Sequence, residues 1–412
     1  MNKNIKLYPI YTMFSYDVLF YYAVYTIYFV TVKGLTVSDI ALFSTFFSAA
    51  CLIFQIPASS IVDKIGNKKS LIIGNILNIV WILIILLFNN FKLFLIGEVI
   101  SGIGFALKNA ATTTFLYSSL KKANRLNEYG RVEGKGSGAY FIIEAIACII
   151  SGYLYTISPY LPITFTAICF AVATIIALNF EEITTPSEYA SSREYFTSLK
   201  SSFSFIFHSP RLRALLLFSL VFYGVVTSSK LLTNAYFLEF NLSSEGFGYA
   251  FAIYAVLSAI GSRLERVIER KHKNNTLQFF SIFYIVLLTI AGILALFKFA
   301  DSKIVYIGVI CFGIQAFLKG AYRVVMKQYM TRYTTQKIRN TLMSFYYLVE
   351  NIGNCLFSFI ASIIIGTLSA HLSCIVMGII LFVLITLVLI YMEKRVGLDP
   401  TTYTKKDRSD LI

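Results

Sequence analysis

Eight ionisable side chains lie inside long apolar stretches of this 412-residue sequence, where acids and bases are rare. Placing such a group in the hydrocarbon of a membrane costs about 2.5–3.5 kcal/mol, so these residues are usually paired or functional. They are the groups that carry protons, form buried ion pairs and bind charged solutes. The eight are Asp17, Glu98, Lys108, Glu144, Lys230, Lys319, Arg323 and Glu350.

Five of these groups fall at a similar depth, about 10–15 Å from one end of their helices at about 1.5 Å per residue. In the first half, we predict that Lys108 pairs with Glu144. In the second half, we predict that Lys319 pairs with Glu350. The two charges of each pair could simply neutralise each other between helices. Alternatively, the same groups could pair across the halves and form a gate. Asp17 is the fifth member of this layer.

Asp17 has no acidic counterpart in the second half, and its neighbours in sequence are aromatic. A lone carboxylate in an apolar setting can take up and release a proton. Asp17 is therefore the first candidate for proton coupling, followed by Glu144 and Glu350.

The other three groups suggest weaker hypotheses. Glu98 and Lys230 fall nearer the opposite end of their helices, at a similar depth, and could form an outer contact. Arg323 lies one turn beyond Lys319. It could bind an anionic substrate, or its long side chain could reach the cytoplasmic interface.

Composition identifies the medium around these helices. Hydrophobic residues make up 57% of the chain and charged residues 14%, whereas soluble domains carry about 45–50% and about 25%. A spanning helix needs about 20 mostly apolar residues, so the sequence predicts an all-α integral membrane protein with twelve transmembrane helices. The expected spans are roughly 8–32, 38–62, 70–88, 92–117, 137–158, 162–180, 212–238, 246–264, 276–297, 303–328, 341–368 and 372–392.

Lysine and arginine positions predict the orientation. The segments expected in the cytoplasm hold 28 of the 36 basic residues, the expected outer loops hold four, and the spans hold four. This asymmetry follows the positive-inside rule with both termini in the cytoplasm. The net charge of +15 therefore reflects topology, and we expect the lipid bilayer rather than nucleic acid as a partner.

The chain is expected to contain two helical bundles joined by a polar linker. The predicted segments are an N-terminal six-helix bundle at 1–180, a cytoplasmic linker at 181–211, a C-terminal six-helix bundle at 212–392 and a cytoplasmic tail at 393–412.

An internal repeat supports two equivalent halves. Span five carries Tyr140 and Glu144, and span eleven carries Tyr346 and Glu350, 206 residues later. Similar matches connect spans four and ten and the loops after spans two and eight. Two such halves are typical of transporters built from parallel repeats, which predicts bundles related by pseudo-two-fold symmetry.

The loop after span two contains the most specific local pattern. Its members are Ser59, Asp63, Lys64, Gly66, Lys68 and Lys69, and the loop after span eight contains Glu265 and Arg266. The order of acid, base, glycine and basic pair resembles the pattern of the major facilitator superfamily, with Ser59 in place of the family's leading glycine. The resemblance extends over essentially the whole chain. It implies a cytoplasmic gate motif with Asp63 as acceptor. The alternative is a short basic turn that obeys the positive-inside rule.

The resemblance implies a secondary active transporter of a small solute that works by alternating access in the plasma membrane. We expect a proton-coupled exporter that functions as a monomer. A proton-coupled uptake symporter is the alternative within transport, and a non-transporting sensor on a transporter scaffold is the alternative outside it. Span five lacks the proline-containing pattern of the family's drug–proton antiporters, which argues against that subgroup.

Patterns of enzyme chemistry are missing from the sequence. The glycine-rich stretch 134–138 lacks the spacing and the Lys-Ser or Lys-Thr pair of a phosphate-binding loop. The three histidines are scattered, and the six cysteines lie in apolar segments as small hydrophobes. We therefore expect no enzyme activity, no cofactor and no metal site.

Overall fold

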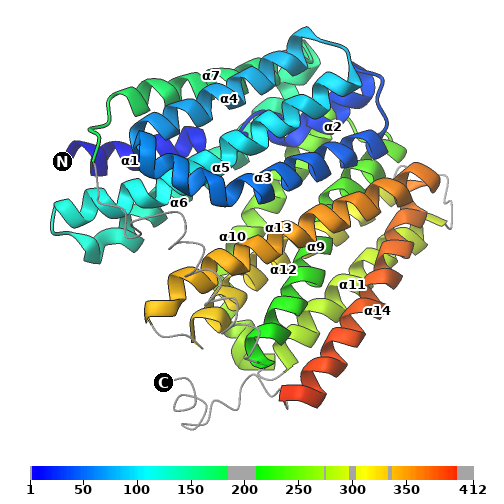
Figure 1. The fold of residues 1–412 in the computed structure, drawn as a ribbon. Helices are drawn as coiled ribbons and strands as arrows, with labels where there is room; N and C mark the ends of the chain where they lie inside the picture. Colours follow the sequence, from blue (N-terminus) through cyan, green and yellow to red (C-terminus); the bar gives the residue numbers. More distant parts are fainter. Residues whose placement is uncertain (1, 184–209, 273–274, 297–302, 333–335, 397–412) are drawn as a thin grey trace. The chain divides into compact units, whose positions relative to one another are not determined.

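The computed structural model describes residues 2–183, 210–272, 275–296, 303–332 and 336–396, and every regular element in these ranges is helical (Figure 1). The helices form two compact units. The first unit contains Met1–Ala190 together with Ser243–Ala252, and the second contains Ser191–Leu242 together with Ile253–Ile412. The sequence-based boundaries had placed the short segment Ser243–Ala252 in the C-terminal bundle.

The first unit is built from helices that follow the first six predicted spans. They are α1 (Asn2–Ser15), α2 (Tyr21–Thr31), α3 (Val37–Ile65), α4 (Asn67–Leu87), α5 (Phe91–Lys122), the short 3₁₀ turn η1 (Leu126–Glu128), α6 (Tyr129–Ile157) and α7 (Leu161–Leu178). Local signals set several ends. Thr36 and Asp39 form a capping box at the start of α3, and the Asn90 side chain accepts N–H bonds at the start of α5.

The second unit contains the helices that follow the last six predicted spans. They are α9 (Pro210–Glu239), α10 (Ser244–His272), α11 (Thr276–Leu296), α12 (Lys303–Arg332), α13 (Gln336–Thr367) and α14 (Ala370–Val396). Most of the predicted linker 181–211 and of the predicted tail 393–412 lies outside the described residues.

Ten of the described helices are long and apolar enough to cross a membrane. The first predicted span, 8–32, is not one helix, because it is divided into α1 and α2 by the non-helical residues 16–20. The prediction of a continuous helix there was wrong. The fourth predicted span is the 32-residue helix α5, which is outside those ten and carries Glu98 and Lys108 along its length.

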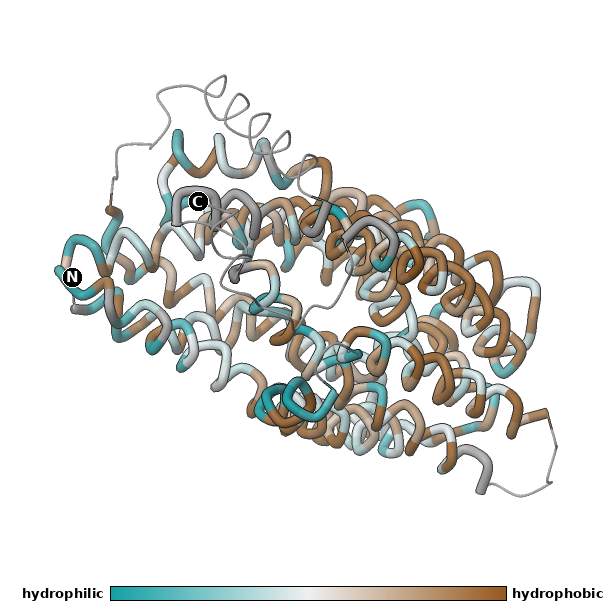
Figure 2. Tube along the Cα trace, turned by 90° about the horizontal axis from the view of Figure 1, so that it is seen from below, coloured by the Kyte–Doolittle hydropathy of each residue, from teal (hydrophilic) through white to brown (hydrophobic). Residues whose placement is uncertain are grey.

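Apolar side chains face outward as well as inward. Leu87 and Ile157 are 73% and 75% exposed, and Figure 2 shows hydrophobic residues along most of the length of the helices. Water would make such surfaces unfavourable, whereas lipid hydrocarbon does not. The exposed apolar residues are therefore consistent with helices surrounded by a bilayer.

Small residues bring helices close together inside each unit. In the first unit α4 lies beside α5 (Figure 1). A Cβ atom on Gly74 would lie only 2.8 Å from the carbonyl oxygen of Gly104. In the second unit, where α9 lies beside α13, a Cβ atom on Gly353 would lie 2.3 Å from the carbonyl oxygen of Leu220. Without a side chain at these positions, the backbones can approach closely, as is common between membrane helices.

Candidate functional site

The break in the first span is held by side chains from three other helices. The Ser15 carbonyl accepts a hydrogen bond from Lys108 Nζ of α5 at 2.9 Å. The Phe20 carbonyl accepts one from Ser151 Oγ of α6 at 2.6 Å. The Tyr21 N–H donates to Thr166 Oγ1 of α7 at 2.9 Å. Irregular backbone at membrane depth is tolerated only where such partners or a water-filled cavity satisfy it.

Asp17 lies inside this break. Its Oδ1 accepts the N–H of Val18 at 2.8 Å, a local bond of the kind by which aspartate competes with helix formation. The side chain is half-buried. Its carboxylate acts electrostatically on Lys108 and on the phenols of Tyr22 and Tyr140.

Lys108 is almost fully buried, with 3% of its surface exposed. Its stem passes over Gly74, where a Cβ atom would lie 2.6 Å from Lys108 Cγ. Its ammonium group lies 3.9 Å from the ring centre of Phe105 and 4.6 Å from that of Phe170. Two aromatic faces and the Ser15 carbonyl together replace part of the hydration that burial removes.

Glu144 belongs to the same neighbourhood. It is 8% exposed, and Tyr140 Oη donates a hydrogen bond to its Oε1 at 3.0 Å. Both Glu144 and Asp17 act electrostatically on Tyr22 and Tyr140. The structure thus gathers Asp17, Lys108 and Glu144 around the break. The direct ion pair between Lys108 and Glu144 stays a prediction.

The second unit contains a corresponding acid on α13. Glu350 is 5% exposed and accepts a hydrogen bond from Tyr346, so the repeated tyrosine–glutamate spacing gives the same contact in both halves. Arg323 and Lys327 of α12 act electrostatically on Glu350. Arg323 also lies 5.9 Å from the ring centre of Tyr223. Lys319 is half-buried, and its predicted pairing with Glu350 stays a prediction.

In the loop between α3 and α4, the structure gives a steric reason for the glycine of the predicted gate motif. Gly66 has φ +93°, and a Cβ atom there would lie 2.8 Å from the carboxylate of Glu182. That carboxylate accepts the backbone N–H groups of Asn67 at 2.9 Å and Lys68 at 3.0 Å. Glu182 therefore caps the start of α4, a role that sequence reasoning did not assign.

Asp63 and Lys64 lie at the end of α3 and Lys69 at the start of α4, whereas Glu265 and Arg266 lie about two turns before the end of α10. Asp63, Lys64 and Lys69 are exposed. In the second unit, Glu265 lies 3.5 Å from Arg266 and accepts a hydrogen bond from Gln328 at 3.2 Å. None of these contacts tests the gating role, which stays a prediction.

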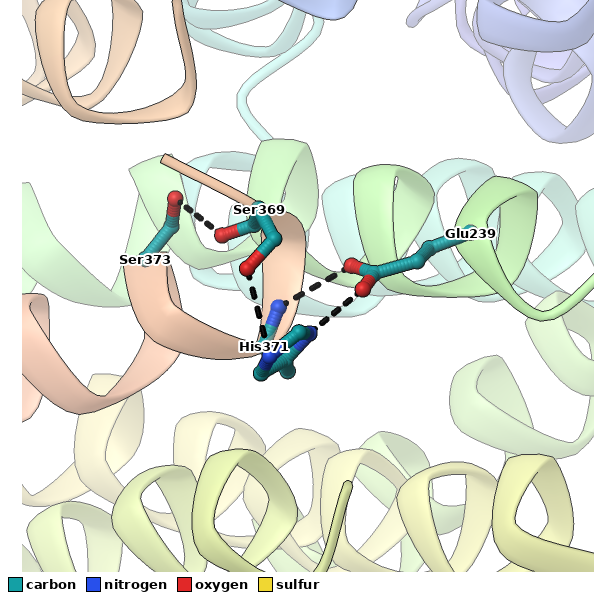
Figure 3. Close-up of polar contacts among 4 residues, drawn as sticks. All are labelled: Glu239, Ser369, His371 and Ser373. Atoms are coloured by element: carbon teal, nitrogen blue, oxygen red, sulfur yellow. Dashed lines mark hydrogen bonds and ion pairs between the residues drawn. The ribbon is translucent and has the colours of Figure 1, made fainter. Parts of the chain in front are cut away.

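Two further polar contacts lie toward the ends of their helices. Glu98 of the first unit accepts a hydrogen bond from Trp81 Nε1 at 3.1 Å. Its predicted outer contact with Lys230 of the second unit stays a prediction. At the end of α9, the Glu239 carboxylate accepts the backbone N–H of His371 at 3.1 Å and contacts the imidazole Nδ1 of the same residue (Figure 3).

Across the described ranges, no three histidine, cysteine, aspartate or glutamate side chains lie close enough to hold an ion. The six cysteines are free thiols.

Comparison with known proteins identifies the fold family. A sequence model described as Major Facilitator Superfamily matches residues 7–314 and 281–410. A search among curated proteins finds no match. The crystal structure of nucleoside transporter NupG aligns with a TM-score of 0.73 and 11% identity, covering 95% of this chain and 100% of that chain.

Two other solved structures have the same fold. A bacterial homolog to human lysosomal transporter Spinster aligns with a TM-score of 0.72 and 14% identity, covering 98% of both chains. A D-xylose-proton symporter aligns with a TM-score of 0.67 and 13% identity, covering 96% of this chain and 97% of that chain. Identities this low establish a shared fold and nothing about substrate. The family match extends over nearly the whole sequence, and this chain therefore belongs to the Major Facilitator Superfamily.

Proposed function

We propose that this protein is a secondary transporter of the plasma membrane that moves a small solute by alternating access and couples that movement to protons through Asp17. The observation that carries the proposal is the position of Asp17 on irregular backbone inside the first span. Broken spanning helices and intramembrane acids are the features that form ion and substrate sites in transporters.

The surroundings of Asp17 suit a group that changes charge. Lys108 supplies a positive charge, and its ammonium is already bonded to the Ser15 carbonyl and stacked on two rings. A proton leaving Asp17 would leave a carboxylate that interacts electrostatically with Lys108. Glu144 and Glu350 are the second candidates for coupling, and Arg323 is the candidate contact for an anionic part of the solute.

Export is the direction we propose. Uptake by proton symport is the second candidate, because one of the solved structures with this fold is a D-xylose-proton symporter. We propose that both termini lie in the cytoplasm, which the distribution of basic residues supports, and that the functional unit is a monomer.

The test measures proton movement in proteoliposomes that contain wild type or Asp17→Asn and receive a panel of cations, anions, sugars, nucleosides and peptides. We expect one solute class to drive proton movement in wild type. Asp17→Asn should lose that movement but keep exchange of labelled solute, because the amide resembles the protonated acid. Asp39→Asn, which alters an acid in the exposed capping box of α3, is the control.

Two results would contradict the proposal. Solute movement without proton movement in wild type would indicate facilitated diffusion. Unchanged proton movement in Asp17→Asn would make Asp17 structural and direct the search to Glu144 and Glu350. Inside-out and right-side-out vesicles then separate export from uptake.

A further inference from the structure

Glu98 is a buried acid that the proposed mechanism does not use. It lies seven residues after Phe91, the first residue of α5, which is about 10 Å into the helix. Only 8% of its surface is exposed. Its carboxyl group accepts the indole N–H of Trp81 from α4 at 3.1 Å. This partner is neutral, so it cannot balance a negative charge.

The titratable groups that face Glu98 from neighbouring helices are also neutral at ordinary pH. Tyr21 of α2 packs edge-on against Trp81, with ring centres 5.4 Å apart. Cys51 of α3 is another such group among the described residues, and both it and Tyr21 interact electrostatically with Glu98. The hydroxyl of Tyr21 is buried and has no hydrogen-bond partner among the described residues.

Two lysines of the first unit are engaged elsewhere, and Lys92, which precedes Glu98 on α5, is exposed. Lys108 lies ten residues further along α5, about 15 Å away along the axis, and is bonded to the Ser15 carbonyl near Asp17. Glu144 of α6 lies in that same neighbourhood. Lys33 donates to the Phe88 carbonyl at 2.7 Å. Within the described part of the chain, no basic side chain contacts the Glu98 carboxyl.

An ionised carboxylate buried without a cation is strongly unfavourable, whereas a neutral carboxylic acid with one hydrogen bond is not. We propose that Glu98 is a second proton-binding site of this protein, separate from the Asp17 break and protonated in the conformation described here. When water reaches the site, the proton passes from the carboxyl oxygen to a water molecule and the carboxylate remains. The binding of the proton does not depend on the proposed transport; its use in coupling rests on that function.

The chain supplies its own reporter for this site. Trp81 is the single tryptophan of the sequence, and its indole N–H is the hydrogen-bond donor to Glu98. A hydrogen bond to a carboxylate is shorter and stronger than one to a neutral acid. Gain or loss of the proton should therefore change the emission of Trp81 directly.

The experiment records Trp81 emission of the purified full-length protein in nanodiscs as pH is varied without a gradient or solute. We expect a single pH-dependent step in wild type, its loss in Glu98→Gln and its persistence in Asp17→Asn. Infrared spectra of the same samples should show a protonated-carboxyl band that disappears in Glu98→Gln and persists in Trp81→Phe.

Each alternative outcome decides the matter. A step that survives in Glu98→Gln, or the absence of both the emission step and a Glu98-dependent carboxyl band, would overturn the proposal. If Glu98→Gln does not fold, the infrared band of Glu98→Asp, shifted from that of wild type, identifies the group instead, and an unshifted band overturns it. Failure of proton-coupled transport would leave these measurements untouched, so the two proposals fail separately.

Discussion

The two units bury the same kind of tyrosine–glutamate pair in different surroundings. In the first unit the pair of Tyr140 and Glu144 lies near a broken helix. In the second unit the pair of Tyr346 and Glu350 lies on α13, which packs beside α9, and α9 is continuous from Pro210 to Glu239. Because the repeat preserves the pair and not the break, the break is a feature of one half alone.

The difference changes how each unit accommodates its cations. In the first unit, the break releases the Ser15 carbonyl, and Lys108 binds it while stacking on two rings. In the second unit, Arg323 and Lys327 act electrostatically on Glu350. In the first unit, the acid that acts electrostatically on Lys108 is Asp17, which lies inside the break, and this position suits a group that exchanges protons. In the second unit Arg323 is half-buried and Lys327 is exposed, so both cations that act on Glu350 are less buried than Lys108.

The largest expected effect comes from removing the cation at the break. Lys108→Met should destabilise the protein by about 3–5 kcal/mol, because Asp17 and the Ser15 carbonyl lose their buried partner. Lys319→Met, at the repeat-related position in the second unit, should have a much smaller effect because that side chain is only half-buried. Thermal unfolding in matched detergent measures both. Equal losses would show that the two lysines have equivalent roles.

The next largest effect is expected from adding a methyl group at the close glycine contact in each unit. Gly74→Ala should cost about 1–3 kcal/mol through overpacking, and it should also displace Lys108, whose Cγ lies 2.6 Å from the new Cβ position. Gly353→Ala should cost a similar amount and leave the break intact. Gly138→Ala is the control, because no atom lies within 4 Å of its Cβ position.

Transport measurements then divide the two glycine variants. Proton-coupled transport per folded molecule should fall in Gly74→Ala and stay close to wild type in Gly353→Ala. Equal transport in both variants would show that the function of the break does not depend on the close α4–α5 contact.

The repeated tyrosines provide a finer test. Tyr140→Phe and Tyr346→Phe should each cost about 0.5–1.5 kcal/mol, the net value of one hydrogen bond. If the first unit exchanges protons and the second is structural, only Tyr140→Phe should shift the pH profile of transport. A shift of equal size in Tyr346→Phe would make both acids part of the coupling.

Much of this architecture could be predicted from the sequence. Apolar segment lengths predicted the helices. The spacing of Tyr140 and Glu144 against Tyr346 and Glu350 indicated a repeat, and the contact that each tyrosine makes with its glutamate is known only from the structure. Gly66 was identified by its place in the family pattern, and its positive φ explains why glycine occupies it.

The break at residues 16–20 could not be predicted in the same way. That stretch contains no glycine or proline, and its apolar character continues through the interruption. The break depends on distant partners, Lys108, Ser151 and Thr166, that replace the helical hydrogen bonds. Such tertiary compensation overrides local propensity and leaves no periodic signal. Asp17 alone gave a hint, as a residue that competes with helix formation.

The smallest expected effect concerns two contacts, one just beyond the C-terminal end of α2 in the first unit and one at the C-terminal end of α9 in the second. Just beyond α2, Lys33 donates to the Phe88 carbonyl at the end of α4. The end of α9 is tied to α14 through Glu239 and His371 (Figure 3). Lys33→Met and Glu239→Gln should each cost about 0.2–1 kcal/mol, as expected for partly exposed polar contacts.

Comparing the two variants tests whether the break makes α2 more sensitive than α9 to the loss of a contact at its C-terminal end. Because α2 has only 11 residues and is separated from α1, its position depends on contacts at both of its ends. Helix α9, by contrast, is continuous over 30 residues. Hydrogen exchange in α2 should therefore increase in Lys33→Met, whereas exchange in α9 should change little in Glu239→Gln. Equal changes in the two helices would mean that the break does not isolate α2 mechanically.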